Sequence, residues 1–452
     1  MFKKVLIANR GEIARRVIRT CKRLNIHTVA IYSEADAESL HVKDADEAYC
    51  VGKPPVAQSY LNIDRIIEIA LESGVEAVHP GYGLLSENAQ FAKLCTEAGL
   101  VFIGPSTDVI ASMGSKLEAR KTMKAAGVPI VEGVEAPVKD AEEATEIAER
   151  LGYPIMLKAS AGGGGIGMQL VENADELAKA FEGNQKRAQS FFGDGTMYME
   201  RFIANPHHVE VQIIADHQGN VVPLFERECS IQRRNQKVVE EAPSPFISQE
   251  TRDKMLEASE KAAKHIGYVN AGTIEYLVDA DQNFYFLEMN TRLQVEHPVT
   301  EEITRLDLVE EQLKIAAKQP LTFTRESITK QGHAIEVRIY AENPSTFFPS
   351  PGTITTLELP AGEGIRNECG VETGSTVTPF YDPMISKLVV WGETRAIACE
   401  RLTQALKAYK VEGIQTNIPM LLKTVTHEQF LNGYTTTKFV EQYYLPQLAE
   451  TK

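Results

Sequence analysis

Cysteine and tryptophan are scarce in this sequence. Six of the 452 residues are cysteine and one is tryptophan. The cysteines are scattered along the chain, at Cys21, Cys50, Cys95, Cys229, Cys369 and Cys399. None has a second cysteine at the C-x-x-C spacing of many zinc sites, so we expect no zinc site. The pattern indicates buried thiols in a reducing compartment.

Long apolar runs are also missing. The first apolar run covers only residues 5–8, which is too short for the core of a signal peptide. No stretch approaches the roughly 20 apolar residues that a membrane span needs. We therefore expect a cytoplasmic protein that does not bind a membrane.

Positive charge is in deficit. The chain has 47 Lys and Arg residues against 62 Asp and Glu residues, which gives a formal net charge of −15 at pH 7. Nucleic acids are bound by clustered lysines and arginines, so we do not expect nucleic acid as the partner. With 43% hydrophobic and 24% charged residues, the composition is that of a globular enzyme rather than a disordered or fibrous protein.

The length of the chain predicts several domains packed into one body. Residues 1–113 alternate short apolar runs with helical patterns, which predicts a doubly wound α/β domain around a parallel sheet. Residues 114–331 form a second region, in which residues 129–202 are expected to be a self-contained lid. Residues 332–446 form a third region of mixed strands and two helices. Strands of the first region are expected at residues 5–8, 28–32, 77–79 and 101–103.

A glycine run marks the predicted lid. A strand ends at Lys158, and four consecutive glycines at 162–165 lead into a second strand that begins at Met168. Glycine allows backbone N–H groups to close around phosphate oxygens, so the run predicts nucleotide binding, and a flexible hairpin tip is the alternative. The Walker A pattern is absent, which excludes a P-loop fold. The loops at 9–12 and 79–83, which follow strands of the first region, have no G-x-G-x-x-G pattern, so nicotinamide binding is unsupported. Lys116 and Glu200 border the lid, and each alone is expected to be a solvated surface charge.

Two apolar segments on either side of residues 279–283 predict an antiparallel hairpin. If the loop is symmetric, Val278 pairs with Tyr285, and Glu275 then lies directly opposite Glu288. Directly opposed carboxylates repel each other. A register slip of one residue, which would place the two glutamates on opposite faces, is the alternative.

The expected surroundings of this glutamate pair favour a bound cation. Phe284 and Phe286 are predicted to share the face of Glu288, so the carboxylates would lie beside apolar surface rather than in open water. Magnesium, which binds one or two carboxylates together with nucleotide phosphates, meets that need.

The second strand of the hairpin is predicted to continue to residue 296. Its two-residue period would place five polar side chains on one face: Glu288, Asn290, Arg292, Gln294 and Glu296. A solvated outer face is one interpretation. The other is a wet cleft in which the last carboxylate, near an amide and a guanidinium, binds a small anion and takes its proton.

Two further positively charged features are ambiguous. Residues 227–237 are the one basic cluster of the acidic chain, and by itself this cluster predicts a surface patch. Arg338 lies in a strand pattern and faces away from its apolar neighbours Ile335 and Val337.

Several segments resemble those of a known family. Y-P-I-M-L-K with the glycine run, and F-L-E-M-N-T-R-L, resemble signatures shared by biotin carboxylases and carbamoyl-phosphate synthetases, both of the ATP-grasp fold. The segments similar to biotin carboxylases alone are I-A-N-R-G-E-I-A, H-P-G-Y-G, S-I-Q-R-R-x-Q-K-V-V-E-E-A-P, R-L-Q-V-E-H-P-V-T-E and Y-D-P-M-I-S-K-L. The resemblance covers residues 1–444.

The resemblance implies a mixed α/β and α+β architecture. Residues 1–113 would be a Rossmann-like N-terminal biotin carboxylase domain, and residues 114–331 an ATP-grasp domain with a mobile lid at 129–202. Residues 332–446 would be the C-terminal biotin carboxylase domain.

The implied activity is ATP-dependent carboxylation of biotin. Bicarbonate would attack the γ-phosphate of ATP to give carboxyphosphate, with Mg²⁺ or Mn²⁺ as the metal. This is the first half-reaction of a biotin-dependent carboxylase such as the acetyl-CoA carboxylase of fatty acid biosynthesis.

The M-K-M biotin-attachment motif is absent, so biotin is expected on a separate biotin carboxyl carrier protein. The resemblance also implies carboxyltransferase subunits as further partners and a homodimer as the assembly. The alternatives are another ATP-grasp ligase of the carbamoyl-phosphate synthetase type and a non-catalytic nucleotide-binding regulator.

The resemblance also assigns the site residues. Nucleotide contacts would come from Lys116, Lys158, Gly163, Gly164, Gly165, Glu200, His208, Gln232 and Asn235. The metal ligands would be Glu275, Glu288 and Asn290. Bicarbonate would be held by Lys237, Arg292, Gln294 and Val295, with Glu296 as its general base. Arg338 would stabilise the biotin enolate, and Tyr82 would lie near the biotin ring.

Two positions depart from the usual sequence of the family. Asn235 stands where R-R-H-Q-K usually has histidine, and Ile166 stands where the glycine run is usually followed by a basic residue. Asparagine can still hydrogen bond to a ribose or phosphate, but Ile166 removes a cation from the lid. We therefore expect weaker ATP binding than in typical relatives.

Overall fold

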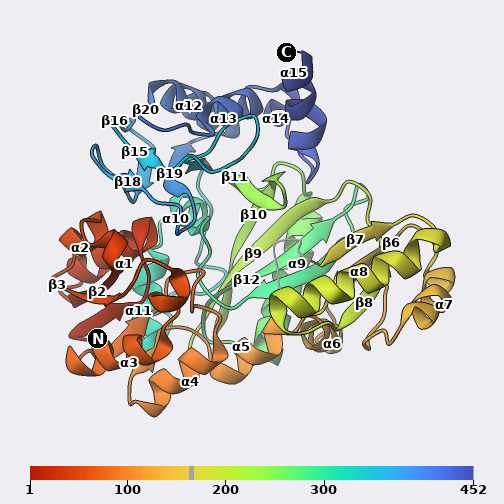
Figure 1. The fold of residues 1–452 in the computed structure, drawn as a ribbon, viewed down its shortest axis with the longest axis horizontal. Helices are drawn as coiled ribbons and strands as arrows, with labels where there is room; N and C mark the ends of the chain where they lie inside the picture. The colour runs from red at the N-terminus through yellow and green to blue at the C-terminus, as the bar shows by residue number, and fades with distance from the viewer. Residues whose placement is uncertain (162–166, 451–452) are drawn as a thin grey trace.

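A computed structural model of the chain describes residues 1–161 and 167–450. Gly163, Gly164, Gly165 and Ile166, which the sequence predicts to contact or modulate the nucleotide, lie outside the described residues. An N-terminal lobe, a C-terminal lobe and a projecting lid surround a central sheet (Figure 1). Within the described part of the chain, none of the helices is both long and apolar enough to cross a membrane.

The N-terminal lobe is the doubly wound domain that the sequence predicts, with a parallel five-stranded sheet in the order β3-β2-β1-β4-β5. Its strands are β1 (Lys4–Ile7), β2 (His27–Ser33), β3 (Glu47–Gly52), β4 (Ala77–His79) and β5 (Val101–Phe102). Its helices are α1 (Gly11–Arg23), α2 (Leu40–Asp44), α3 (Ile63–Glu72), α4 (Ala89–Glu97) and α5 (Thr107–Gly114), with 3₁₀ turns η1 (Glu34–Asp36) and η2 (Val56–Gln58). The edge strand β3 was not predicted, because its short, half-exposed sequence has little apolar periodicity.

All six cysteines are free, and the prediction that they are buried is wrong for one of them. Cys50 is exposed because it lies on the edge strand β3, whereas the other five thiols are buried.

The central sheet has eight strands in the order β13-β12-β9-β10-β11-β14-β19-β17, and neighbouring strands are antiparallel. They are β9 (His207–Ala215), β10 (Val221–Arg233), β11 (Gln236–Ala242), β12 (Asn270–Val278), β13 (Phe284–Asn290), β14 (His333–Tyr340), β17 (Ile365–Cys369) and β19 (Met384–Gly392). The helices around it are α6 (Lys116–Ala125), α9 (Gln249–His265), α10 (His297–Thr304) and α11 (Leu308–Ala316). Because β11 pairs with β14, one sheet continues from the second region of the chain into the third.

The lid is a small antiparallel sheet in the order β7-β6-β8, covered by helices (Figure 1). Its elements are α7 (Ala141–Leu151), β6 (Ile155–Ala159), β7 (Met168–Val171), α8 (Ala174–Phe192) and β8 (Met197–Arg201). Helix α8 is capped at both ends. The side chain of the N-cap residue Asn173 accepts a hydrogen bond from Glu176 N, and the C-cap residue Gly193 adopts a left-handed φ of 72°. The lid has its own apolar core, which includes Leu157 and Phe181.

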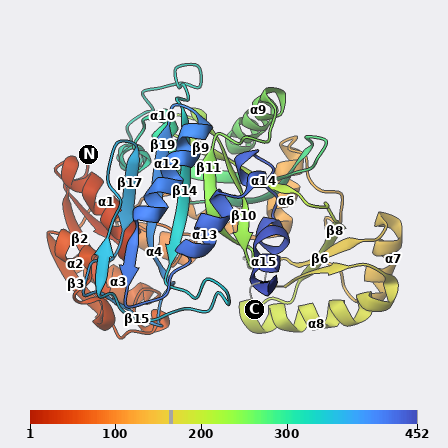
Figure 2. The same ribbon diagram turned by 90° about the horizontal axis from the view of Figure 1, so that it is seen from above.

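The C-terminal lobe packs helices against the far half of the central sheet, and α12 lies across β14 and β19 (Figure 2). Its helices are α12 (Arg395–Ala408), α13 (Ile418–Val425), α14 (Glu428–Leu431) and α15 (Leu445–Glu450), with the π-helical turn η3 (Val440–Tyr444). Its short strands are β15 (Gly352–Thr353), β16 (Thr356–Glu358), β18 (Thr376–Val377) and β20 (Lys410–Glu412).

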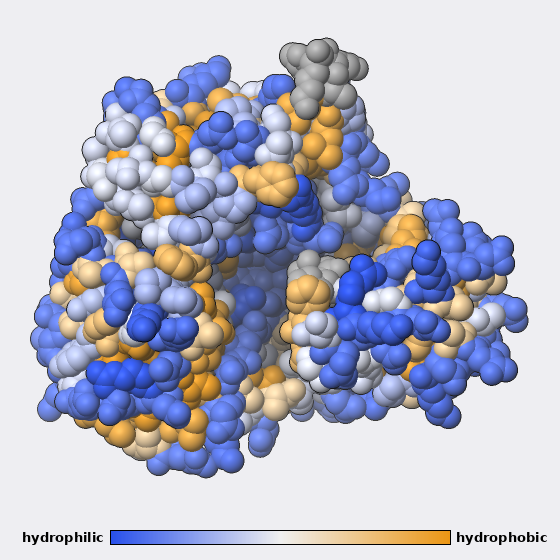
Figure 3. All heavy atoms as spheres, viewed as in Figure 1, coloured by the Kyte–Doolittle hydropathy of each residue, from blue (hydrophilic) through white to orange (hydrophobic). Residues whose placement is uncertain are grey.

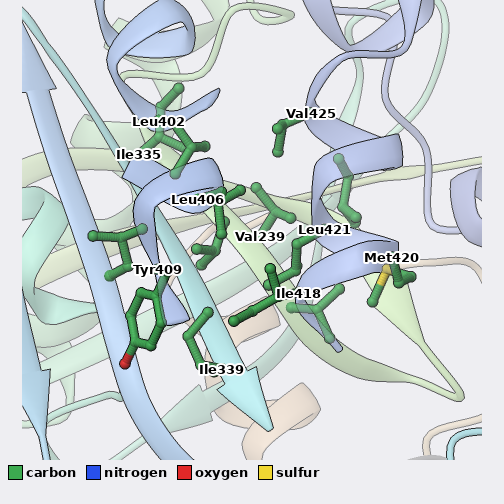
Figure 4. Packing of buried hydrophobic residues seen from close by; sticks show 14 of the residues in the cluster. Val239, Ile335, Ile339, Leu402, Leu406, Tyr409, Ile418, Met420, Leu421 and Val425 are labelled. Atoms are coloured by element: carbon green, nitrogen blue, oxygen red, sulfur yellow. The ribbon is translucent and has the colours of Figure 1, made fainter. Parts of the chain in front are cut away.

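The core of this lobe crosses the predicted boundary near residue 331. Val239 of β11 packs with Ile335 of β14, Leu402 and Leu406 of α12, and Leu421 of α13 (Figure 4). Full burial of each such side chain contributes about 1.5–3 kcal/mol. The apolar face of β11 and β14 is therefore held by this core, which leaves the opposite face of the two strands for the polar residues described below.

Candidate active site

Strands β12 and β13 place Glu275 and Glu288 opposite each other, as the sequence predicts. The register nearer the loop is different, because Val278 pairs with Phe284 and not with Tyr285. A β-bulge next to Glu288 inserts one residue and restores the pairing of the two glutamates.

The bulge also changes which side chains share a face. Phe286 pairs with Tyr276, and both are buried in the core that includes Phe284. Glu288 instead lines a cavity together with Leu287. The prediction that the phenylalanines share the face of Glu288 is therefore wrong, because the inserted residue shifts the two-residue alternation.

The predicted strand through residue 296 is also wrong. Strand β13 ends at Asn290, and the chain turns into α10, for which Glu296 is the N-cap and which has Pro298 in its first turn. The polar row is nevertheless gathered in one place by the intervening loop. Arg292 Nη2 donates to Asn290 Oδ1 at 2.8 Å, and Gln294 Nε2 donates to Glu275 Oε1 at 2.7 Å.

Lys237 on β11 lies at the centre of a buried charge network. Its Nζ lies 2.6 Å from Glu210 Oε2, 2.8 Å from Glu275 Oε1 and 2.7 Å from Glu296 Oε1. The three glutamates are at most 3% exposed. Burial raises the pKa of Glu296, but the charges of Lys237 and Arg338 outweigh it and hold this pKa well below its usual value. Glu296 is therefore ionised at neutral pH.

Arg338 on the neighbouring strand β14 completes the surroundings of Glu296. Its Nε donates to Glu240 Oε1 at 2.6 Å, and its Nη2 donates to Glu296 Oε2 at 3.1 Å. Ile335 and Val337 point to the opposite side, into the core of the C-terminal lobe. The cross-strand pairing of β11 and β14 thus brings Lys237 and Arg338 to one carboxylate.

Arg227 is part of the same network, although the sequence places it in a surface cluster. Its side chain is fully buried, and its guanidinium donates to Glu210 Oε1 at 2.5 Å, Gln212 Oε1 at 2.6 Å and Gln294 Oε1 at 2.7 Å. The surface interpretation is wrong because Glu210 and Gln212 alternate with apolar residues of a buried strand and need buried partners. That alternation was the signal in the sequence.

The N-terminal lobe contributes Tyr82 through loops at the carboxyl ends of β1 and β4, where open α/β sheets bind ligands. Asn9 Nδ2 joins these loops by donating to Tyr82 O at 2.8 Å. The Tyr82 hydroxyl donates to Glu12. Lys387 Nζ of β19 lies 3.4 Å from Glu12 Oε1 and donates to Val295 O at 2.6 Å.

A cavity of about 310 Å³ lies between the lid and the central sheet. Figure 3 shows a hydrophilic hollow between the lobes of the molecule. Sequence-predicted residues that line the cavity are Lys116, Lys158, Glu200, His208, Gln232, Asn235, Glu275 and Glu288. Lining residues that the sequence did not reveal include Tyr198, Leu277, Leu287, Thr437, Lys438 and Glu441.

Two charged groups of this cavity, Lys158 and Glu200, are paired with each other inside the protein. The ammonium of Lys158 contacts the carboxylate of Glu200, and Arg120 Nη1 donates to Glu200 Oε2 at 2.8 Å. Burial lowers the pKa of Lys116, although the charge of Glu288 acts in the opposite direction. The interpretation as a solvated surface charge is therefore wrong for Glu200, which is buried and ion-paired, whereas Lys116 is half-buried and lines the cavity.

Family models and relatives match nearly the whole chain. The models are "Biotin carboxylase, N-terminal domain" at residues 1–110, "Carbamoyl-phosphate synthase L chain, ATP binding domain" at 115–324 and "Biotin carboxylase C-terminal domain" at 336–442. The chain is 64% identical to the biotin carboxylase of Halalkalibacterium halodurans, over 98% of each chain. It is 62% identical to biotin carboxylase 2 of Bacillus subtilis, over 98% of this chain and 100% of the relative.

The chain belongs to the biotin carboxylase family. A solved structure agrees: the biotin carboxylase domain dimer of Hydrogenobacter thermophilus 2-oxoglutarate carboxylase, in complex with MgADP, ADP and bicarbonate, has a TM-score of 0.96 and 50% identity, over 98% of each chain. The activity is therefore that of an ATP-dependent ligase that carboxylates biotin with bicarbonate. This finding favours the biotin carboxylase interpretation over another ATP-grasp ligase or a regulator.

The residues of the biotin carboxylase site fit a magnesium ion. Burial and the charge of Glu275 raise the pKa of Glu288 above its usual value. Among residues 1–161 and 167–450, no hydrogen bond or ion pair to the Glu288 carboxylate is found. Asn290 Nδ2 donates to Glu275 Oε1 at 2.8 Å, which adds an amide to the two carboxylates. Two carboxylates beside the cavity between the lid and the central sheet form the kind of oxygen-rich donor set that Mg²⁺ takes.

Asn235, which departs from the usual biotin carboxylase sequence, occupies a tight turn. Arg233 pairs with Gln236, so Arg234 and Asn235 form a two-residue loop between β10 and β11, with φ values of 52° and 63°. Asparagine adopts this left-handed conformation readily. Asn235 therefore suits the turn and at the same time lines the cavity between the lid and the central sheet.

Proposed function

We propose that Glu296 is the general base that removes the proton of bicarbonate as it attacks the γ-phosphate of ATP. The observation that carries the proposal is the Glu296 carboxylate, buried and ionised between Lys237 and Arg338. An incoming bicarbonate anion competes for these cations, which weakens their hold on Glu296 and strengthens it as a base. The bond between the β- and γ-phosphates breaks, ADP leaves, and carboxyphosphate is formed while the proton stays on Glu296.

The bicarbonate anion is held by Lys237, Arg292, Gln294 and the backbone at Val295. Arg292 is anchored by Glu87, since its Nε donates to Glu87 Oε2 at 2.8 Å. Fixed cations beside the reacting anion supply preorganised stabilisation without reorganisation during the reaction.

The nucleotide lies in the cavity between the lid and the central sheet. Lys116 and Lys158 bind its phosphates, and Glu200, His208, Gln232 and Asn235 contact the rest of the molecule. Gly163, Gly164 and Gly165, which lie outside the described residues, are further nucleotide contacts on this proposal. Glu275, Glu288 and Asn290 hold Mg²⁺ or Mn²⁺. The metal neutralises charge on the transferring phosphoryl group.

Biotin binds on the side of Glu296 where Arg338 and Tyr82 lie. Carboxyphosphate breaks down to carbon dioxide beside the biotin ring, and the released phosphate takes the ureido proton. The guanidinium of Arg338 then faces the developing enolate and stabilises its negative charge.

The partners follow from this chemistry. Biotin arrives on a separate carrier protein, a carboxyltransferase subunit uses the carboxylated product, and the chain forms a homodimer in the cytoplasm. A dimer of a 50% identical biotin carboxylase domain supports the homodimer. The chain is divided into an N-terminal domain at 1–113, an ATP-grasp domain at 114–331 and a C-terminal domain at 332–446. Residues 129–202 of the ATP-grasp domain are the mobile lid.

The deciding experiment measures ATP cleavage with bicarbonate, in the presence and absence of free biotin or a biotinylated carrier protein. We expect biotin to stimulate turnover. A chain that binds ATP but shows no biotin-stimulated cleavage would overturn the proposal.

A further inference from the structure

Two buried carboxyl groups beside Arg338 have no role in the chemistry described so far. Glu240 on β11 and Glu336 on β14 are direct cross-strand partners. Both side chains are fully buried. Direct partners in an antiparallel pair project to the same face, with Cβ atoms about 5 Å apart. The two carboxyl groups therefore lie side by side, on the face that carries Arg338.

Neither carboxyl group is fully satisfied. Glu240 Oε1 accepts the hydrogen bond from Arg338 Nε, but Glu240 Oε2 has no hydrogen-bond partner among the described residues, and neither carboxyl oxygen of Glu336 has one. Burial raises the pKa of Glu240 to about 7, and burial followed by the charge of Glu240 raises the pKa of Glu336. Two adjacent buried carboxylates cannot both stay ionised at low cost, so one proton belongs to the pair.

Charged neighbours do not supply the missing partners. The titratable groups around the pair are Arg338 and Tyr340 on β14, Lys237 on β11, Cys229 on β10, Lys387 on β19, Tyr82 after β4, and Glu296 and His297 at the start of α10. Lys237 is bonded to three other glutamates, and Lys387 Nζ is bonded to Val295 O. Arg338 is thus the cation that hydrogen bonds to the pair.

We propose that Glu240 and Glu336 share one proton, and that the single negative charge of this carboxyl pair holds the Arg338 guanidinium, through its Nε, in its working orientation. The inference rests on the proposed role of Arg338 toward biotin. Arg338 Nε donates to Glu240 Oε1, and Nη2 lies 2.6 Å from the same oxygen and 3.1 Å from Glu296 Oε2. The guanidinium is thus anchored on the Glu240 side, and its longer contact, to Glu296, is the one that substrate can replace. A second negative charge on the pair would draw the guanidinium away from Glu296. Glu240 and Glu336 are therefore positioning residues.

The kinetic test compares Glu336→Gln with wild type across pH, with biotin-dependent ATP cleavage as the readout. Glutamine resembles the protonated carboxyl group and cannot ionise. A group with a raised pKa loses its proton as the pH rises, so the wild type is expected to lose turnover at alkaline pH when the pair gives up its proton. Glu336→Gln should keep turnover near neutral pH and should lose this alkaline decline.

Glu240→Gln removes the ionic partner of Arg338 Nε. We expect an increase of about tenfold in KM for biotin, because the acceptor of Arg338 Nε loses its negative charge and the charge-assisted hydrogen bond is weakened. The KM for ATP should not change, since neither Glu240 nor Arg338 lines the nucleotide cavity. The matched control is Glu241→Gln on the same strand, which faces the other side and pairs with His333 and Arg395. It should leave the biotin KM and the pH profile unchanged.

Infrared difference spectroscopy during a pH titration tests the shared proton without turnover. The carbonyl band of a protonated carboxyl group should titrate in wild type and in Glu241→Gln, and should be absent from Glu336→Gln. An unchanged carbonyl band in Glu336→Gln would overturn the shared proton. If the band is lost but Glu336→Gln still loses turnover at alkaline pH as the wild type does, the positioning role is overturned. Failure of the proposed function would instead appear as wild type without biotin-stimulated cleavage, while the band still reports on the pair.

Discussion

Glu296→Gln is the substitution that tests the general base most directly. It keeps the length of the side chain but removes its negative charge and most of its ability to accept a proton. Lys237 keeps Glu210 and Glu275 as partners, and Arg338 keeps Glu240. Neither cation is left buried without a counter-ion, so we expect the fold to survive.

The expected loss follows from the contribution of a general base, which is about 10²–10⁴-fold in rate, or about 3–5 kcal/mol in activation free energy. The kcat/KM for bicarbonate should fall by at least about 100-fold on this basis. The Kd for ATP should remain close to that of wild type, because Glu296 does not line the nucleotide cavity.

The assay combines bicarbonate-dependent ADP release with calorimetric titration of ATP. A matched control is Glu301→Gln, a buried glutamate of the same helix α10 that accepts hydrogen bonds from Arg16 and Arg366 at 2.7 and 2.8 Å. The control should lower stability and leave the bicarbonate kinetics unchanged. Bicarbonate-dependent cleavage at the wild-type rate by Glu296→Gln would refute the assignment of the base.

Three other predictions concern the nucleotide, the metal and stability. The double variant Asn235→His, Ile166→Arg should bind ATP more tightly than wild type in a nucleotide titration, and an unchanged affinity would contradict the expected effect of these positions. Glu288→Gln should raise the Mg²⁺ concentration needed for half-maximal ATP cleavage, and the same metal dependence as wild type would remove Glu288 from the ligand set. Burial raises the pKa of Glu368, but Arg366 and other arginines outweigh it and bring this pKa to about 2. The ionised Glu368 therefore contributes about 3 kcal/mol to the free energy of unfolding above pH 4.5, and this contribution is lost as the pH falls toward 2. Arg366→Ala should therefore destabilise the protein by about 3–5 kcal/mol near neutral pH in denaturant unfolding, with a smaller effect at pH 3.

The sequence predicted the N-terminal parallel sheet well because local signals define it. Each strand there is a short apolar run followed by a helical pattern, and the loops with Asn9 and Tyr82 follow strand ends. The pairing of Glu275 with Glu288 was also predictable, because a hairpin sets its register within a few residues. The bulge beside Glu288 has no such local signal, so the predicted residue pairs between the loop and Glu288 were wrong by one residue.

The residues around Glu296 could be gathered from the sequence only through family resemblance. Alternation predicted one long strand, whereas Pro298 and the N-cap at Glu296 start a helix there. The contact between Lys237 and Glu296 joins segments 59 residues apart, and the contact between Arg338 and Glu296 joins segments 42 apart. Such contacts depend on strand order in the sheet, which periodicity does not specify.

The strand order explains why one carboxylate can serve both parts of the reaction. Lys237 on β11 belongs to the region that holds the nucleotide, and Arg338 on β14 belongs to the region that follows it in the chain. These strands are neighbours in one sheet, and Glu296 bonds to both cations. On the proposed roles, protonation of Glu296 by bicarbonate removes the charge that pairs with Arg338 Nη2. Arg338 keeps Glu240 as a partner but then has one fewer anion beside it, so it stabilises the biotin enolate more strongly at the stage when carboxyphosphate has formed. Formation of the carboxylating species and activation of biotin are in this way coupled through the ion pair of Arg338 and Glu296.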